Sequence, residues 1–241
     1  IRVDDSAGRP FAKTVPGAFL DLVIEAVHRN FAPPQLTALL KHPLTRLGLG
    51  AFEVRRAARA LELAAFRADY FGIGLDGVAA ALSEARMETG ASERRERRSR
   101  AVQRLWDEDW DAAQSLVERL QNAFRPLATL YASAAPSSLR ELAAAHIAVA
   151  EALSELPAPI SATDEANAGS PASEKAASAE IKTNNQNATA AGEKIENESQ
   201  DAQPTASLLY RGEAGEAASS LFTGLIDPQL PQLPLAPPDY A

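Results

Sequence analysis

The sequence predicts an all-α fold, an irregular multi-helix array of about seven or eight helices that is interrupted by a disordered insert. Large apolar residues recur at every third or fourth position through most of the chain, which is the spacing that lines one face of a helix. Aromatic residues make up 6% of the chain and hydrophobic residues 46%, so the core must rest on Leu and Ala, which favour helices. Residues 158–206 differ: Ser, Ala, Thr, Asn, Gln, Glu and Lys dominate there. Such a segment buries too little apolar surface to offset the entropy of ordering it.

We therefore expect three regions: a helical accessory region over 1–157, a disordered low-complexity insert over 158–206, and a C-terminal helix with a proline-rich tail over 207–241 that leads into a further element. The net charge of −8 is unevenly placed. Residues 1–157 hold 20 Lys and Arg against 20 Asp and Glu, whereas the insert holds 3 against 8 and the C-terminal region holds 1 against 4. The acidity of the chain is thus no argument against nucleic-acid contact by the helical accessory region.

The first predicted helix opens at Thr14 and Pro16 and runs to Asn30. A second starts at Pro33-Pro34, because proline is favoured in the first turn of a helix, and ends at Pro43. The buried stripe of the first helix is predicted to contain Phe19, Leu20, Val23, Ile24 and Val27.

The stretch Pro33–Gly50 should form a broken apolar helical knuckle that other helices cover. Leu44, Leu47 and Leu49 are expected to continue its apolar face beyond Pro43. His42 is expected to cap the carbonyls of the short helix.

Ala51–Tyr70 is predicted to be the longest helix. The glycines at 72, 74 and 77 then break the pattern, and the next helix is expected over Val78–Met87. No Lys follows these glycines and a helix precedes them, so they favour a connecting loop over a phosphate-binding loop.

Helical spacing resumes at Ala101, and Pro126 is expected to end that helix. Ser138 and Glu141 form a capping-box pattern for the next one. His146 falls on its apolar stripe, which favours a hydrogen-bonded core histidine over a metal ligand. The remaining expected features are a helix over Gly212–Leu225, with Ala218, Leu221, Phe222 and Leu225 inward, and an extended tail over Asp227–Tyr240.

Several chemistries find no support in the sequence. The chain has no cysteine, which excludes disulfides and cysteine-bound metal within it. The acids Asp107, Glu108, Asp109 and Asp111 begin a helix and point in different directions, so they favour a helix-start electrostatic role over a metal or nuclease site. We predict no catalytic residue and no metal site. We accordingly expect this chain alone neither to hydrolyse ATP nor to cut DNA.

The segment that best suggests a partner is an arginine run. Six arginines fall within eleven residues, diluted by Glu93 and Glu96. On a helix, three of them would share one face and two another. Two interpretations stay open, a solvated helix face and contacts with DNA phosphates. The tentative DNA-binding residues are Arg94, Arg95, Arg97, Arg98, Arg100 and Arg104.

Three separated stretches carry a resemblance: VDDSAGRPFAKTVPGAFLDLV at Val3–Val23, ALLKHPLTRLGL at Ala38–Leu49 and RGEAGEAASSLF at Arg211–Phe222. Together they are similar to the AddB family of double-strand break repair proteins, of alphaproteobacterial type. The insert departs from the pattern of that family, whose connection at this point is shorter.

The resemblance implies a subunit of an ATP-dependent helicase–exonuclease that resects broken DNA ends for homologous recombination. It implies an AddA-like helicase–nuclease subunit and DNA ends as partners, and no membrane. The nuclease domain, the iron–sulfur cluster, the magnesium and the ATP of that family would lie outside this fragment. This chain would then supply structure, subunit contact and a DNA-guiding surface.

Two other hypotheses come from different classes: a free-standing helical scaffold that binds a partner protein, and an inert globular domain. The chain starts with Ile1, not Met, and closes on a proline-rich run, which favours a fragment of a longer protein. It shows neither a long apolar run nor a signal peptide, so we expect a cytoplasmic location.

Overall fold

The fold is all-α, as the sequence predicts. The computed structural model describes residues 10–67, 70, 72–90, 99–133, 135–158, 207–229 and 234–240. These residues contain seven α-helices and one two-stranded sheet. The helices are α1 (Val15–His28), α2 (Pro33–Lys41), α3 (Ala51–Leu61), α4 (Gly74–Gly90), α6 (Asp107–Ala132), α7 (Leu139–Ser154) and α8 (Gly212–Ile226). The predicted disordered insert lies outside the described residues, apart from its first residue. No described helix combines the length and the apolar composition that crossing a membrane requires.

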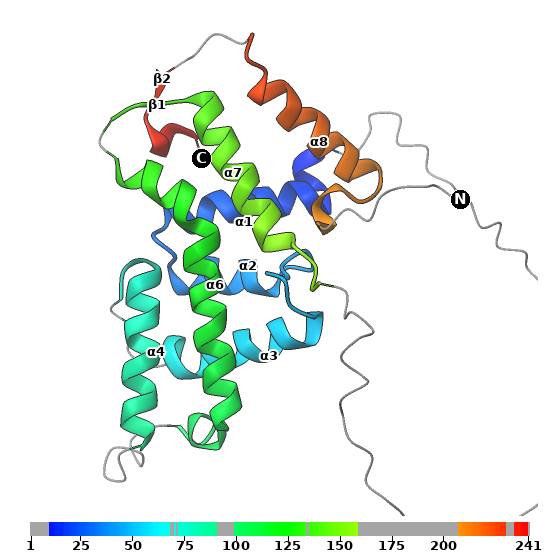
Figure 1. Cartoon of the computed structure of the whole chain (residues 1–241). Helices are drawn as coiled ribbons and strands as arrows, with labels where there is room; N and C mark the ends of the chain where they lie inside the picture. Colours follow the sequence, from blue (N-terminus) through cyan, green and yellow to red (C-terminus); the bar gives the residue numbers. More distant parts are fainter. Residues whose placement is uncertain are drawn as a thin grey trace, which may run out of the picture. The chain divides into compact units, whose positions relative to one another are not determined.

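Helix α6 is the element on which the helices α3, α4 and α7 pack (Figure 1). Its inward face carries large side chains with little or no exposure, among them Trp110, Leu116, Leu120 and Phe124. At 26 residues α6 is the longest described helix, so the prediction that Ala51–Tyr70 would be longest is wrong.

Pro126 lies inside α6, which corrects the prediction that the helix stops there. A proline within a helix costs about 3 kcal/mol, because it cannot donate to the carbonyl four residues earlier. Beyond it Leu127 is fully buried, and Leu130 and Tyr131 also pack on the core. Full burial of Leu127 contributes about 1.5–3 kcal/mol, which is of the same size as the cost of the missing bond, and the partly buried Leu130 adds to it.

Helix α3 is shorter than the sequence predicts. After Leu61 the chain makes a π-helical turn over Glu62–Phe66, in which the N–H of Arg67 donates to the carbonyl of Glu62, 3.1 Å away. The chain leaves the helix at Arg67, so Tyr70 lies outside it. The wider turn buries three successive residues, Leu63, Ala64 and Ala65.

Gly72 and Gly77, at the start of α4, allow a close approach of two backbone segments. Helix α4 begins at Gly74, four residues before the predicted start, and Gly77 lies in its first turn. A Cβ on Gly77 would lie 2.8 Å from the Cα of Gly72, so the two backbones approach too closely for side chains. Of the three glycines only Gly72 lies in the connecting segment, and Gly74 and Gly77 belong to the first turn of α4, so the loop is shorter than predicted.

The first helix follows its prediction closely. The hydroxyl oxygen of Thr14 accepts the N–H of Gly17 at 3.2 Å and thereby caps α1. All members of the predicted stripe are buried.

The knuckle after α2 differs from the prediction. Residues beyond Pro43 form turns, not a further helical face. The N–H groups of Arg46 and Leu47 donate to the carbonyl of Leu153 at 2.7 and 3.0 Å, and that of Gly48 donates to Glu155 at 2.8 Å. The knuckle therefore caps the C-terminal end of α7.

His42 does not cap the carbonyls of α2 through its side chain, contrary to the prediction. Its Nδ1 accepts the N–H of Leu44 at 3.3 Å, and its ring stacks on Phe19 with centroids 5.0 Å apart. The hydroxyl of Thr45 donates to the carbonyl of Leu39 at 2.6 Å instead. Thr45 comes close to Leu39 only because the chain turns back after α2, so the local sequence pattern does not predict this hydrogen bond.

The tail beyond α8 folds back onto the core, so the prediction of an extended tail is wrong. Strand β2 (Pro234–Leu235) pairs antiparallel with β1 (Ser137–Ser138), and a 3₁₀ turn over Pro237–Tyr240 follows. The hydroxyl of Tyr240 lies 3.3 Å from Nδ1 of His146. On α8, Leu221 is 46% exposed and not inward as predicted.

The described residues on either side of the predicted insert contact each other. Glu155 and Ser207 form an isolated antiparallel bridge, and the hydroxyls of Ser154 and Ser207 lie 2.6 Å apart. Contacts between described residues thus hold the end of α7 against the segment that precedes α8.

We therefore expect that replacing residues 159–206 with a flexible linker of about eight Gly and Ser residues leaves the fold intact. Shortening the loop should raise the free energy of unfolding by about 1–2 kcal/mol through a smaller closure entropy. Urea unfolding followed by circular dichroism measures this, and Ser207→Ala should cost about 1 kcal/mol in both chains. Loss of cooperative unfolding on replacement would contradict the prediction.

Candidate nucleic-acid interface

The start of α6 is tied to α3 through a single carboxylate. Asp109 Oδ2 accepts the backbone N–H of Trp106 at 3.0 Å, which caps the helix, and Oδ1 accepts Nε of Arg56 at 2.6 Å. Trp106 is the N-cap residue, in extended backbone conformation. The carboxylate thus fixes the backbone of Trp106 against the outer face of α3.

This carboxylate is ionised at neutral pH. Partial burial of Asp109 disfavours its charged form, but hydrogen bonds from Arg56 and from the N–H of Trp106 more than offset that effect and lower its pKa. The side chain of Asp109 is only 14% exposed, so solvent screens the pair less than it would a surface pair. We expect the link between α3 and α6 to persist across the physiological pH range.

Two large aromatic side chains are exposed beside this link. Trp106 is 74% exposed, and Phe52 is 76% exposed one helical turn before Arg56 on α3. Trp110, one turn further along α6, is by contrast 3% exposed. Exposed rings of this size on the two helices that the Arg56–Asp109 ion pair joins are candidates for contact with a ligand.

Exposed arginines lie near the two aromatic side chains in the chain, on α3 and in the segment before Trp106. Arg55 and Arg59 are exposed on α3, and Nε of Arg55 donates to the carbonyl of Ala51 at 2.9 Å. Arg100 and Arg104 are exposed in the segment that leads into α6. We call the set Phe52, Arg55, Arg56, Arg59, Arg100, Arg104 and Trp106 the α3–α6 surface.

The structure describes only some residues of the predicted arginine run. Arg94, Arg95, Arg97 and Arg98 lie outside the described residues, between the end of α4 and the segment before α6. Arg100 and Arg104 do not share an α-helical face, because Val102–Arg104 form a 3₁₀ turn, and this corrects the helical placement. Val102 anchors that turn with 3% exposure. Within the described ranges of the chain neither arginine has an ion-pair partner.

Sequence reasoning missed the contribution of α3. The periodicity of α3 predicts that its outer face, which carries Arg55, Arg56 and Arg59, is exposed to water. An exposed helix face does not by itself indicate a binding partner. Their relevance depends on the contact between Arg56 and Asp109, which are far apart in the sequence. The pattern Trp-x-x-Asp before an apolar stripe was the available signal for the cap at Trp106.

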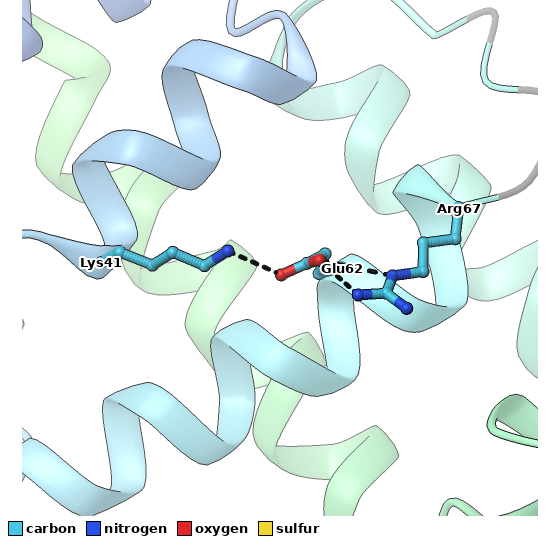
Figure 2. Close-up of polar contacts among 3 residues, drawn as sticks. All are labelled: Lys41, Glu62 and Arg67. Atoms are coloured by element: carbon cyan, nitrogen blue, oxygen red, sulfur yellow. Dashed lines mark hydrogen bonds and ion pairs between the residues drawn. The ribbon is translucent and has the colours of Figure 1, made fainter.

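A second ion-pair cluster lies at the far end of α3. Figure 2 shows the carboxylate of Glu62 between Lys41, from the end of α2, and Arg67. Lys41 Nζ lies 3.0 Å from one oxygen, and Arg67 Nη2 lies 3.0 Å from the other. The hydrogen bonds from Arg67, then from Lys41, lower the pKa of Glu62. Glu62 offsets one of the two positive charges of this cluster, which lies at the opposite end of α3 from Phe52 and is separate from the α3–α6 surface.

The predicted helix-start role of the acidic cluster agrees with the geometry. The carboxylate of Asp109 turns to α3, and that of Asp111 pairs with Arg86 of α4 at 2.7 Å. Asp107 and Glu108 are exposed, so the α3–α6 surface has carboxylates at its edge. Among the described residues, no three His, Asp or Glu side chains gather where they would hold a metal ion.

His146 is a hydrogen-bonded core histidine, as predicted. It is 6% exposed, and its ring nitrogens lie 3.3 Å from the hydroxyl of Tyr240 and 3.2 Å from the carbonyl of Leu20. Burial lowers its pKa to about 4. An open groove of about 740 Å³ lies beside it, lined by apolar residues of α1 and by Asp21 and Glu25.

No family model, curated protein or solved structure matches this chain, so the comparisons with known proteins do not assign it to a family.

Proposed function

We propose that this chain is a DNA-guiding helical region of an AddB-like subunit that acts with an AddA-like partner on broken DNA ends. In this role it binds the sugar–phosphate backbone and contributes no catalytic group. ATP, magnesium and the iron–sulfur cluster of such a complex would act elsewhere.

The α3–α6 surface carries the proposal. Guanidinium groups suit phosphate because they present several N–H donors in a fixed plane. Exposed aromatic rings interleaved with arginines are typical of surfaces that follow a nucleic-acid strand. Asp109 holds Arg56 in place, so this region of the surface is ordered before any ligand arrives.

The arrangement of the resembling stretches gives additional support. Helix α1, which holds the end of the first stretch, contacts both α2 and α8, which hold residues of the other two. The three stretches thus meet in one folded unit, which is expected if they share an origin in one domain.

The test is the salt dependence of DNA binding after charge reversal. Arg55, Arg59, Arg100 and Arg104 of the α3–α6 surface are changed together to Glu, and the affinity for a fluorescein-labelled oligonucleotide is measured by anisotropy at several salt concentrations. For each phosphate that the variant no longer binds, the slope of log K against log salt should fall by about 0.7 with a single strand and about 0.9 with a duplex. Affinity should fall steeply at low salt.

A matched control changes the net charge by the same amount elsewhere on the chain. Lys13, Arg29, Arg125 and Arg211 are all exposed, and none belongs to the α3–α6 surface. Their joint change to Glu should leave the slope almost unchanged, provided that circular dichroism shows intact helices in both variants. Equal slopes for the unaltered chain and the first variant would overturn the proposal.

A protein-binding scaffold is the second candidate function. Its supporting observation is a set of exposed large apolar side chains on α1, α4 and α8, namely Val15, Met87 and Leu221, which are 51%, 68% and 46% exposed. A subunit contact of the AddB-like kind would use the same property.

A further inference from the structure

We infer that Trp106 stacks on an unpaired base, so that the α3–α6 surface selects single-stranded over double-stranded nucleic acid. This inference rests on the proposed function and deepens it by naming the form of the ligand. It assigns a specificity role to a residue that arginine contacts with phosphate alone would not require.

The first support is the combination of a fixed backbone and a free ring. The N–H of Trp106 is bound by Asp109, and the following residues are already helical. The indole itself is 74% exposed and has no ring-stacking partner among the described residues. A side chain of this kind loses little freedom when a flat group lies on it.

The second support is the pairing of rings with cations. Phe52 lies one helical turn from Arg56, whose guanidinium shares a carboxylate with the N–H of Trp106. Arg104 lies two residues before Trp106 in the chain. A strand whose phosphates meet the arginines would bring its bases to the rings, because each nucleotide carries both groups.

The third support is the chemistry of the two forms of nucleic acid. In a duplex the faces of the bases are covered by their neighbours, and only the edges are open in the grooves. An aromatic side chain stacks on a base only where that base is unpaired. Arginines alone would bind both forms, so preference for the single strand must come from the rings.

Intrinsic fluorescence reports on Trp106 directly. The chain has two tryptophans, and only Trp106 is exposed, because Trp110 is 3% exposed. Single-stranded oligothymidine should quench the Trp106 signal, whereas a duplex and an abasic oligonucleotide of the same length should leave it nearly unchanged. In the Trp106→Phe variant this quenching should disappear.

Affinity separates stacking from phosphate contact. Trp106→Ala should weaken oligothymidine binding by about tenfold, the loss expected for one stacked base, and should leave abasic and duplex affinities unchanged. Trp106→Tyr should restore most of the affinity. The matched control is Ile73→Ala, a change at another exposed apolar residue that is 77% exposed, and it should alter none of these affinities.

The outcomes distinguish this inference from the proposed function. Salt-dependent binding that is equal for oligothymidine and the abasic strand would overturn the stacking role and leave phosphate binding intact. If no oligonucleotide binds with measurable salt dependence, both ideas fail, and Trp106 becomes a candidate for a protein contact instead.

Discussion

Phe124→Ala is expected to lower the free energy of unfolding by about 3–5 kcal/mol, the cost of removing a buried aromatic side chain and leaving a cavity. Phe124 has no exposed surface, and its ring meets that of Phe31 edge-to-face, with centroids 4.9 Å apart. Phe31 sits in the loop between α1 and α2, with a φ of +56°. The contact therefore holds a strained loop residue against α6, and removing it affects both.

Urea unfolding at neutral pH measures this change, and Phe52→Ala is the matched control. The two substitutions remove the same atoms, but Phe52 is 76% exposed, so its change should stay within about 0.5 kcal/mol. Similar losses at both positions would show that the packing on α6 described above is wrong.

The second large effect concerns acid stability. The pKa of His146 is about 4 in the folded chain against 6.5 ordinarily, because burial disfavours the imidazolium. Between these values the unfolded chain binds more protons than the folded chain, so stability falls as pH drops from 6.5 to about 4 and this contribution is complete above 6.5. The expected loss is about 3 kcal/mol.

Other groups titrate in the same window, so a difference between variants is needed. Asp21 and Glu25 lie beside His146, and Glu62 and Asp109 have lowered pKa values that also cost stability in acid.

Urea midpoints at several pH values, compared between the unaltered chain and His146→Gln, isolate the contribution of the histidine. The variant should be less stable at pH 7 and less sensitive to acid. His28→Gln, the same change at an exposed histidine, is the matched control for the substitution itself. Parallel profiles for the unaltered chain and His146→Gln would refute the prediction.

Local signals in the sequence predicted much of the fold. The capping box at Ser138 and Glu141 forms as expected, with the Ser138 hydroxyl accepting the N–H of Glu141 at 3.2 Å. The start of α1 at Thr14 and the core position of His146 follow from the same kind of local pattern. Each depends on residues within a turn or two of one another.

Features that depend on distant residues were not predictable in this way. Pro126 is tolerated because Phe124 and Leu127, on either side of it, are fully buried in the core, and the tail contacts the core where Tyr240 meets His146. The α3–α6 surface depends on a bond between Arg56 and Asp109. The sequence identified the arginines near this surface through their density alone and did not identify the aromatic residues among them.

The capping of α7 by the knuckle has a consequence for the order of folding. The last carbonyls of α7 accept N–H groups from Arg46, Leu47 and Gly48, which are synthesised long before them. The turn after α2 therefore lacks these hydrogen-bond partners on a growing chain until α7 has left the ribosome. Closing so long a loop is slow, so the N-terminal helices should acquire their full protection against amide exchange late, together with α7.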